Sequence, residues 1–82
     1  MKKLDFNDNK NIIAKNFKIA RVKNGISQQQ LAAKMQVLGV NIDQQMISKI
    51  ENNTRLVTDY ELACFCRALS VSPESLIGEF LK

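Results

Sequence analysis

Residues 43–52 read Asp-Gln-Gln-Met-Ile-Ser-Lys-Ile-Glu-Asn, and this stretch is the most informative part of the chain. Asp43 is a suitable helix N-cap, because its carboxylate can accept hydrogen bonds from the free backbone N–H groups at a helix start. On a wheel with about 100° per residue, the following residues divide into two sides. The apolar side has Met46, Ile47 and Ile50, and the polar side has Gln44, Gln45, Ser48, Lys49 and Asn52. The stretch therefore predicts a short amphipathic helix with an amide-rich outer side.

The polar side of this helix carries the side chains that read base edges in a DNA major groove. Gln and Asn can bond adenine through two hydrogen bonds, Ser can reach several bases, and Lys can reach guanine or a phosphate. An ordinary surface helix is the alternative interpretation, and such a helix usually mixes Glu with Lys. Here the only acid after the cap is Glu51, at the boundary between the two sides. The stretch alone is compatible with DNA binding but does not require it.

Length, composition and charge limit the other possibilities. The chain has 82 residues, enough for one small domain with a modest core. Aromatic, Gly and Pro residues are scarce, which suits helices better than a β-sandwich or barrel. The net charge is +4; residues 1–49 have nine basic and three acidic side chains, whereas residues 50–82 have three basic and five acidic ones. This asymmetry favours a polyanionic partner, although a merely solvated surface can have the same composition.

Two cysteines and no histidine leave little scope for metal or nucleophilic chemistry. Cys64 and Cys66 fall in a predicted helix, where side chains two residues apart diverge and cannot readily form a disulfide. We interpret them as reduced thiols of a cytoplasmic protein, with Cys66 in the core and Cys64 more peripheral. No apolar run is long enough to span a membrane. Because no nucleophile–base motif or Gly-rich phosphate loop is present, we expect no enzyme activity, cofactor, metal or small-molecule substrate.

The sequence predicts four helices besides the one after Asp43. They begin near Asn9 and after Ser27, Thr58 and Ser72. The first ends at Asn24 before Gly25, and the second reaches Leu38 before Gly39, since Gly tolerates the conformation that follows a helix. Capping boxes mark the second helix, with Ser27 and Gln30, and the fourth helix, with Thr58 and Glu61. Pro73 suits the first position of the fifth helix. Residues 1–8 are polar and are expected to form an N-terminal arm to a single domain over residues 9–82.

The first predicted helix has two apolar stripes. One consists of Ile13, Phe17 and Ala20, and the other of Ile12, Ile19 and Val22. One small core cannot readily bury both, so the second stripe should meet the arm, the C-terminal tail or a partner chain, with the tail or a partner preferred. Arg21 lies beside the main stripe, where a cation needs a partner.

Four segments together indicate a family. They are Gly25-Ile26-Ser27-Gln28-Gln29-Gln30-Leu31-Ala32, Ile47-Ser48-Lys49-Ile50-Glu51-Asn52, residues 62–71 and Ser75-Leu76-Ile77. In this order and near this spacing, over roughly residues 11–80, the chain resembles the phage repressor and Cro-like (Xre-like) helix-turn-helix family. The resemblance implies an all-α, compact five-helix lambda-repressor-like DNA-binding domain. In that fold the second helix crosses the phosphate backbone and the third enters the major groove.

The resemblance also assigns roles to individual residues. The positions that match base-reading residues are Gln44, Gln45, Ser48 and Lys49. The positions that match backbone-phosphate contacts are Gln28, Asn52 and Arg55. Arg21 and Glu51 match a partly buried ion pair, which supplies the partner that the position of Arg21 requires.

The chain departs from the family between the second and third helices, where the family segment is usually shorter. Either the second helix is extended or the turn is enlarged, and the helical spacing of Met35 and Leu38 favours the extended helix. Asn41 is then an alternative to Asp43 as the cap of the third helix. A second departure is Asn53, where glycine is common; Asn is the next best residue for a positive φ.

These observations lead us to expect a sequence-specific double-stranded-DNA-binding transcriptional regulator, a repressor that binds a palindromic operator as a homodimer. Two copies related by a twofold axis would read half-sites about 34 Å apart. The dimer surface is expected on the fifth helix and adjoining tail, with the spare stripe of the first helix as a further contribution. The alternative is a protein-interaction module on the same fold, such as an antitoxin or accessory subunit.

Overall fold

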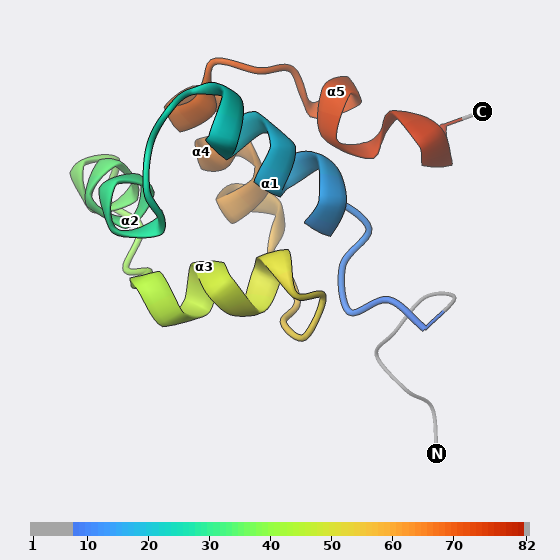
Figure 1. Cartoon of the computed structure of the whole chain (residues 1–82), viewed down its shortest axis with the longest axis horizontal. Coiled ribbons are helices and arrows are strands. Elements are labelled where there is room, and N and C mark those ends of the chain that lie inside the picture. Colours follow the sequence, from blue (N-terminus) through green and yellow to red (C-terminus); the bar gives the residue numbers. More distant parts are fainter. Residues whose placement is uncertain (1–7, 82) are drawn as a thin grey trace.

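The structure is a computed structural model that describes residues 8–81, and within them five α-helices and a final 3₁₀ turn follow one another (Figure 1). The elements are α1 (Ala14–Lys23), α2 (Gln28–Val37), α3 (Gln44–Glu51), α4 (Asp59–Leu69), α5 (Pro73–Ile77) and η1 (Gly78–Phe80). The predicted all-α, five-helix class is confirmed. The predicted N-terminal arm lies outside the described residues except for Asp8.

The core centres on a contact between α1 and α4. The rings of Phe17 and Phe65 have centroids 4.6 Å apart and planes inclined by 61°. This edge-to-face geometry adds about 0.5–1.5 kcal/mol beyond the burial of the two rings. The other helices contribute the fully buried side chains Leu31, Met35, Ile47, Ile50 and Leu76. Because every helix supplies part of one core, no helix is expected to be stable apart from the others.

Local hydrogen bonds start α2, α4 and α5 where the sequence predicted. Ser27 Oγ accepts the N–H of Gln30 at 3.0 Å, and the Gln30 side chain accepts the N–H of Ser27 at 2.7 Å. Thr58 and Glu61 form the same reciprocal box at the start of α4. Ser72 caps α5 through its hydroxyl. These contacts satisfy backbone donors that a helix start leaves unpaired.

The connection between α2 and α3 contains both an extended helix and an irregular turn. α2 continues to Val37 with Leu38 as its C-cap, and Gly39 leaves the helix with a φ of +87°. The Asp43 carboxylate accepts a first-turn N–H of α3 at 2.9 Å, so Asp43 is the cap and the alternative Asn41 is wrong. The turn is anchored by two buried side chains, Val40 and Ile42. The connection is thus fixed by packing as well as by the cap.

α1 begins at Ala14 rather than near Asn9, so its predicted start is wrong. The reason is the side chain of Asn11, which is 9% exposed. Its amide donates to the carbonyl of Ile50 at 3.1 Å and to the carbonyl of Arg55 at 3.0 Å. The described residues before Ala14 therefore tie the chain to the end of α3 through Asn11 instead of extending α1.

Because α1 begins at Ala14, the second predicted apolar stripe of this helix loses its first residue, Ile12. Ile12 precedes the helix and packs against the core, so it does not share a face with the other two residues. Ile19 is 44% exposed and Val22 is 59% exposed. Neither the described C-terminal tail nor another helix buries them, and they remain an apolar patch on the surface.

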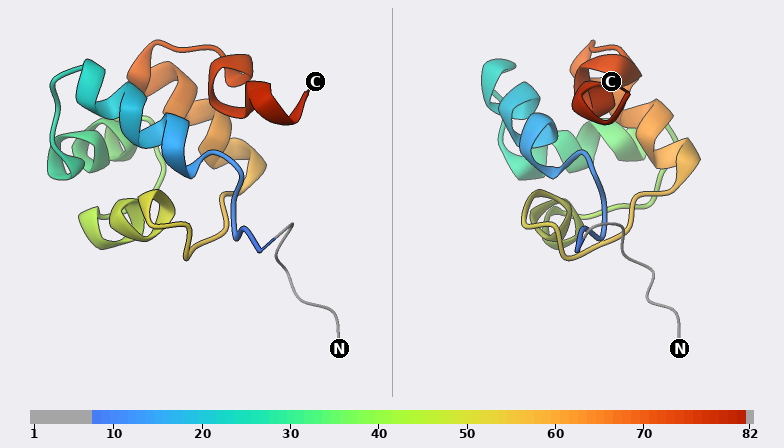
Figure 2. Two further views of the ribbon diagram at one scale, coloured as in Figure 1. Left: turned by 45° about the vertical axis from the view of Figure 1, so that its right-hand side comes forward. Right: turned by 90° about the vertical axis from the view of Figure 1, so that its right-hand side faces the viewer.

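α3 lies along one edge of the domain. In Figure 2 it occupies the lower side, below α1 and α4, and the described N-terminal stretch passes close to its end. It packs mainly against α2 and α1. This arrangement buries one side of α3 and leaves the opposite side facing outward.

Candidate nucleic-acid interface

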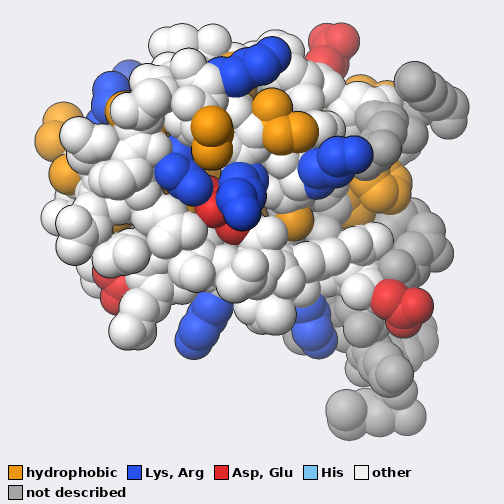
Figure 3. Space-filling view, in the orientation of Figure 1, with side chains coloured by type: hydrophobic (Ala, Val, Ile, Leu, Met, Phe, Trp, Pro, Cys, Tyr) orange, Lys and Arg blue, Asp and Glu red, His pale blue; other side chains and the backbone are white. Residues whose placement is uncertain are grey.

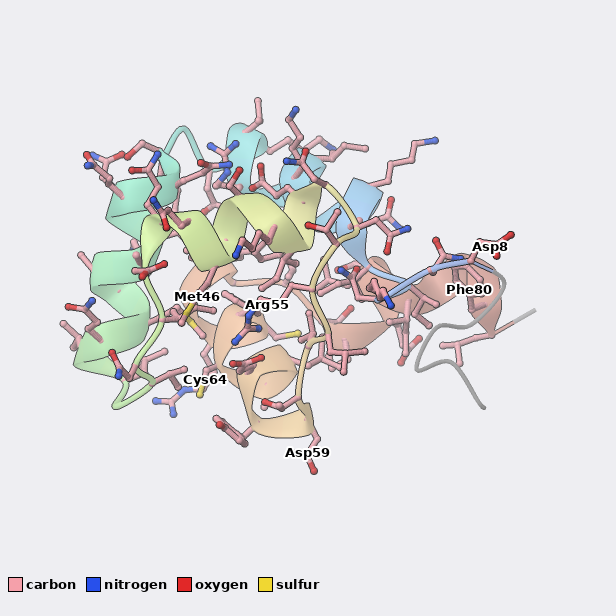
Figure 4. All side chains as sticks on the ribbon, turned by 90° about the horizontal axis from the view of Figure 1, so that it is seen from below. Asp8, Met46, Arg55, Asp59, Cys64 and Phe80 are labelled. Atoms are coloured by element: carbon pink, nitrogen blue, oxygen red, sulfur yellow. The ribbon has the colours of Figure 1, made fainter. Side chains whose placement is uncertain are left out.

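The outer side of α3 carries the predicted base-reading residues. Ile47 and Ile50 are fully buried and fix which side of the helix faces inward. Exposed on or beside the outer side are Gln44, Gln45, Lys49 and Asn52, with Ser48 half-buried. Figure 4 looks at the domain from below, and α3 lies in front of the other described helices in that view. A large ligand can therefore approach this row of polar side chains.

Gln28 connects the start of α2 with both ends of α3. Its side-chain amide donates to a carboxylate oxygen of Glu51 at 3.0 Å. Its carbonyl oxygen accepts from the amide of Gln44 at 3.4 Å, a long hydrogen bond. The structure thus brings Gln28, one of the three predicted phosphate contacts, together with Gln44, a predicted base-reading residue.

Arg21 and Glu51 form an ion pair that fixes α3 to α1. Arg21 Nε lies 2.6 Å from Glu51 Oε2, and the two side chains are 13% and 3% exposed. A second hydrogen bond of 3.1 Å joins Arg21 to the other carboxylate oxygen, and a third of 2.8 Å goes to the carbonyl of Ile26. The hydrogen bond to Glu51 is the main cause that raises the pKa of Arg21. Geometry and charge both hold the C-terminal end of α3 against α1.

A second ion pair, between Arg55 and Glu61, fixes the loop that follows α3. The Arg55 guanidinium donates to both carboxylate oxygens, at 2.9 and 3.0 Å, and to the carbonyl of Leu56 at 2.8 Å. Burial alone would raise the pKa of Glu61, but hydrogen bonds from Arg55 and Thr58 outweigh burial and lower it. Figure 4 shows the labelled Arg55 side chain directed back toward α4. The capping box with Thr58 is a complete local explanation for Glu61, and no sequence pattern indicated its ion pair with Arg55.

Asn53 links the same loop to the chain before α1. Its φ is +61°, so the predicted positive φ is confirmed. Its side-chain oxygen accepts the N–H of Lys10 at 2.9 Å and the N–H of Asn11 at 3.1 Å, while its amide donates to the side chain of Asn9. The end of α3 is therefore bordered by residues from the N-terminal part of the described chain.

A sequence model for a protein family described as helix-turn-helix matches residues 17–76. The chain belongs to the Cro/Xre-like helix-turn-helix family. It is accordingly a DNA-binding regulator of the helix-turn-helix type. A search of curated protein sequences gives no match. Among residues 8–81, no helix combines the length and apolar character that crossing a bilayer requires.

Most of the predicted contact residues of this Cro/Xre-like domain lie on α3 or at its two ends. Gln45, Ser48 and Lys49 follow Gln44 along the helix, and Asn52 is its C-cap. Arg55 differs, because its guanidinium is directed to Glu61. No sequence pattern predicted this difference, since an ion pair across a loop has no fixed spacing.

Basic side chains prevail on one broad face of the Cro/Xre-like domain. In Figure 3, which has the orientation of Figure 1, Lys and Arg side chains gather over α1 and surround apolar side chains there. The basic residues of α1 are Lys15, Lys18, Arg21 and Lys23. The charge asymmetry of the sequence thus corresponds to a basic surface beside α3, which favours the approach of a polyanion.

Proposed function

We propose that this chain is a cytoplasmic transcriptional repressor that binds double-stranded DNA in a sequence-specific manner. In this proposal it binds a palindromic operator as a homodimer. The observation that carries the proposal is the exposed amide-rich side of α3 in a member of the Cro/Xre-like family. The nearly buried Glu51 and the buried Glu61 anchor the end of α3 and its following loop through arginines. A recognition helix has to be held firmly if its side chains are to distinguish base pairs.

In the proposed complex, α3 lies in the major groove and α2 crosses the adjacent backbone. The residues proposed to read base edges are Gln44, Gln45, Ser48 and Lys49. The residues proposed to contact phosphates are Gln28, Asn52 and Arg55. The side-chain chemistry supports this division. A Gln or Asn amide can form two hydrogen bonds to the edge of one adenine, whereas a phosphate oxygen accepts a hydrogen bond from any donor. Arg55 has five N–H donors, of which three are bonded to Glu61 and to the carbonyl of Leu56, so the other two are the ones that would contact a phosphate.

A homodimer is proposed because one domain of this size reads few base pairs. Two copies on a palindrome would double the number of bases read and place the half-sites about 34 Å apart. The C-terminal end is the proposed surface, where Phe80 is 39% exposed and Leu81 is 61% exposed. The exposed Ile19 and Val22 of α1 could extend it. Pairing of such side chains would remove apolar area from water and stabilise the dimer.

Selection of binding sites from random duplex DNA tests these proposals together. We expect a palindromic motif whose half-sites are one helical turn apart, and binding that weakens steeply with salt. Measurement of the mass of the complex on the selected site then gives the number of chains bound. Selection of no preferred sequence would overturn sequence-specific binding, and a single non-repeated half-site occupied by one chain would overturn the homodimer.

A protein-interaction module is the second candidate, and the patch on α1 favours it. Ile19 and Val22 lie among Lys15, Lys18 and Lys23, and DNA phosphates offer no apolar surface to cover the two aliphatic side chains. A protein with acidic residues around an apolar anchor would cover both features. Under this alternative the chain would show no salt-dependent affinity for duplex DNA.

A further inference from the structure

The stretch before α1 is held against the end of α3 by a group of hydrogen bonds between residues far apart in sequence. The side-chain oxygen of Asn53 accepts the backbone N–H groups of Lys10 and Asn11, at 2.9 and 3.1 Å. Asn11 in turn donates to the carbonyls of Ile50 and Arg55, at 3.1 and 3.0 Å. We call these bonds the asparagine clamp. The clamp fixes the backbone of Lys10 one hydrogen bond away from the loop that follows α3.

The burial and bonding of the two asparagines indicate that the clamp holds the backbone near Lys10 in one position. Asn11 is 9% exposed, and both its amide group and its oxygen are engaged, the oxygen by the N–H of Ile13 at 3.0 Å. Asn53 adopts a φ of +61°, a conformation that Asn tolerates better than most residues. Buried polar groups with all their partners present are costly to displace. Lys10 therefore starts from a defined backbone position.

The Lys10 side chain is exposed beside the loop that follows α3. It lines one open hollow with Thr54, Arg55 and Thr58, and a neighbouring hollow that also includes Asp59. Among the described side chains, neither the Arg21–Glu51 pair nor the Arg55–Glu61 pair includes Lys10, and no described carboxylate forms an ion pair with its ammonium. Asn52, the neighbour of Asn53, is exposed beside the same loop.

We propose that Lys10 binds a backbone phosphate of duplex DNA at the C-terminal end of α3, and that Asn53 and Asn11 are the residues that position it. The inference rests on the proposed DNA-binding function and adds a contact from outside the helix-turn-helix itself. A phosphate is the expected ligand rather than a base, because Lys10 lies beyond the end of α3 and carries a single flexible charge. Such a contact adds affinity on every sequence and leaves base preference unchanged.

The test compares Lys10→Gln with the matched control Lys34→Gln. Lys34 is also exposed, but it lines the surface between α2 and α4 instead of the end of α3. Loss of one phosphate contact should reduce the slope of log affinity against log salt by about 0.9, which corresponds to a loss of roughly fivefold at about 0.15 M salt. Lys34→Gln should leave the slope at its wild-type value. Both lysines are exposed, and thermal melts of both variants should match that of the wild type.

A second variant tests the positioning role of the clamp. Asn53→Gly keeps the positive φ but removes every side-chain hydrogen bond of Asn53. In the Asn53→Gly background, adding Lys10→Gln should change the salt slope much less than it does in the wild type. An equally large change in both backgrounds would show that Lys10 acts without the clamp and would overturn the positioning role.

The outcomes separate this inference from the proposed function. If the wild-type chain binds duplex DNA with salt dependence, but Lys10→Gln and Lys34→Gln have the same slope, the Lys10 contact is refuted and DNA binding stands. If the wild-type chain binds no duplex, the proposed function fails first and the Lys10 contact falls with it. A loss confined to the selected operator would also contradict the inference, because it would indicate base reading rather than a phosphate contact.

Discussion

Replacing Arg55 by methionine would leave the nearly buried Glu61 carboxylate with one backbone hydrogen-bond donor, the N–H of Thr58. Exposed ion pairs contribute about 0–1 kcal/mol, whereas removing one partner of a buried pair costs about 3–5 kcal/mol. The side chains of Arg55 and Glu61 are 25% and 5% exposed, so the pair is close to the buried limit. Because the N–H of Thr58 still donates to Glu61, at 3.0 Å, we take the lower end of that range. Arg55→Met should therefore destabilise the domain by about 3 kcal/mol.

The expected loss depends on pH in a direction set by Glu61. In the wild type the pKa of Glu61 is lowered on folding, so its stabilisation is present above the unfolded-state pKa and is lost as pH falls through the folded-state value. Without Arg55, burial becomes the main influence and raises the pKa of Glu61 instead. The variant can then relieve its penalty by binding a proton. The difference between wild type and variant should shrink as pH falls from neutral toward about pH 3.

Thermal and urea unfolding followed by circular dichroism measure this effect. A loss of about 3 kcal/mol corresponds to a melting temperature lower by about 12–24 °C in a domain of this size. The double variant Arg55→Met/Glu61→Gln is the control, because glutamine keeps the capping box with Thr58 but carries no charge. It should regain more than half of the lost stability. If Arg55→Met melts within about 2 °C of the wild type at neutral pH, or if its deficit does not depend on pH, the buried-pair reasoning is refuted.

Three further predictions address the interface and the core. Gln45→Ala should lower affinity for the selected operator by about 1–3 kcal/mol and relax the preference at one base pair in competition binding; an equal loss on random duplex would contradict base reading. Arg21→Met leaves Glu51 nearly buried without its cation, and urea unfolding should show a loss of about 3 kcal/mol; a wild-type midpoint would contradict it. Burial raises the pKa of Cys66, so an aromatic disulfide reagent at pH 8 should modify Cys64 first, and equal rates would count against this assignment.

The sequence was informative where the structure depends on neighbours in the chain. The caps Ser27, Asp43 and Thr58 act on residues within one turn, so their spacing alone predicted where three helices begin. The start of α1 was mispredicted because Asn11 bonds to carbonyls 39 and 44 residues away. A local pattern carries no record of such partners, and the apolar spacing before Ala14 continued to resemble a helix.

The candidate site shows the same distinction between local and distant causes. The amphipathic pattern of α3 predicted which side chains face outward, since two buried isoleucines determine its rotation. The partner of Arg21 was predicted only through the resemblance to a family. The second ion pair was missed because Glu61 already had a sufficient local explanation as a capping residue. A residue that satisfies one local pattern can thus conceal a second contact from sequence analysis.

Stability and recognition have partly separate sources in α3. The helix has eight residues, whereas an isolated helix needs about 12–15 residues to be even marginally stable in water. Ile47 and Ile50 contribute about 1.5–3 kcal/mol each through burial, but apolar contact is non-directional and constrains the exact orientation of a short helix weakly. Hydrogen bonds from Arg21 and Gln28 to Glu51 are directional, and they act at the end of α3 farthest from the Asp43 cap. The isoleucines therefore determine which side of α3 faces inward, while the polar contacts at its two ends restrict the remaining freedom of the helix and so the exact position of its outer amides.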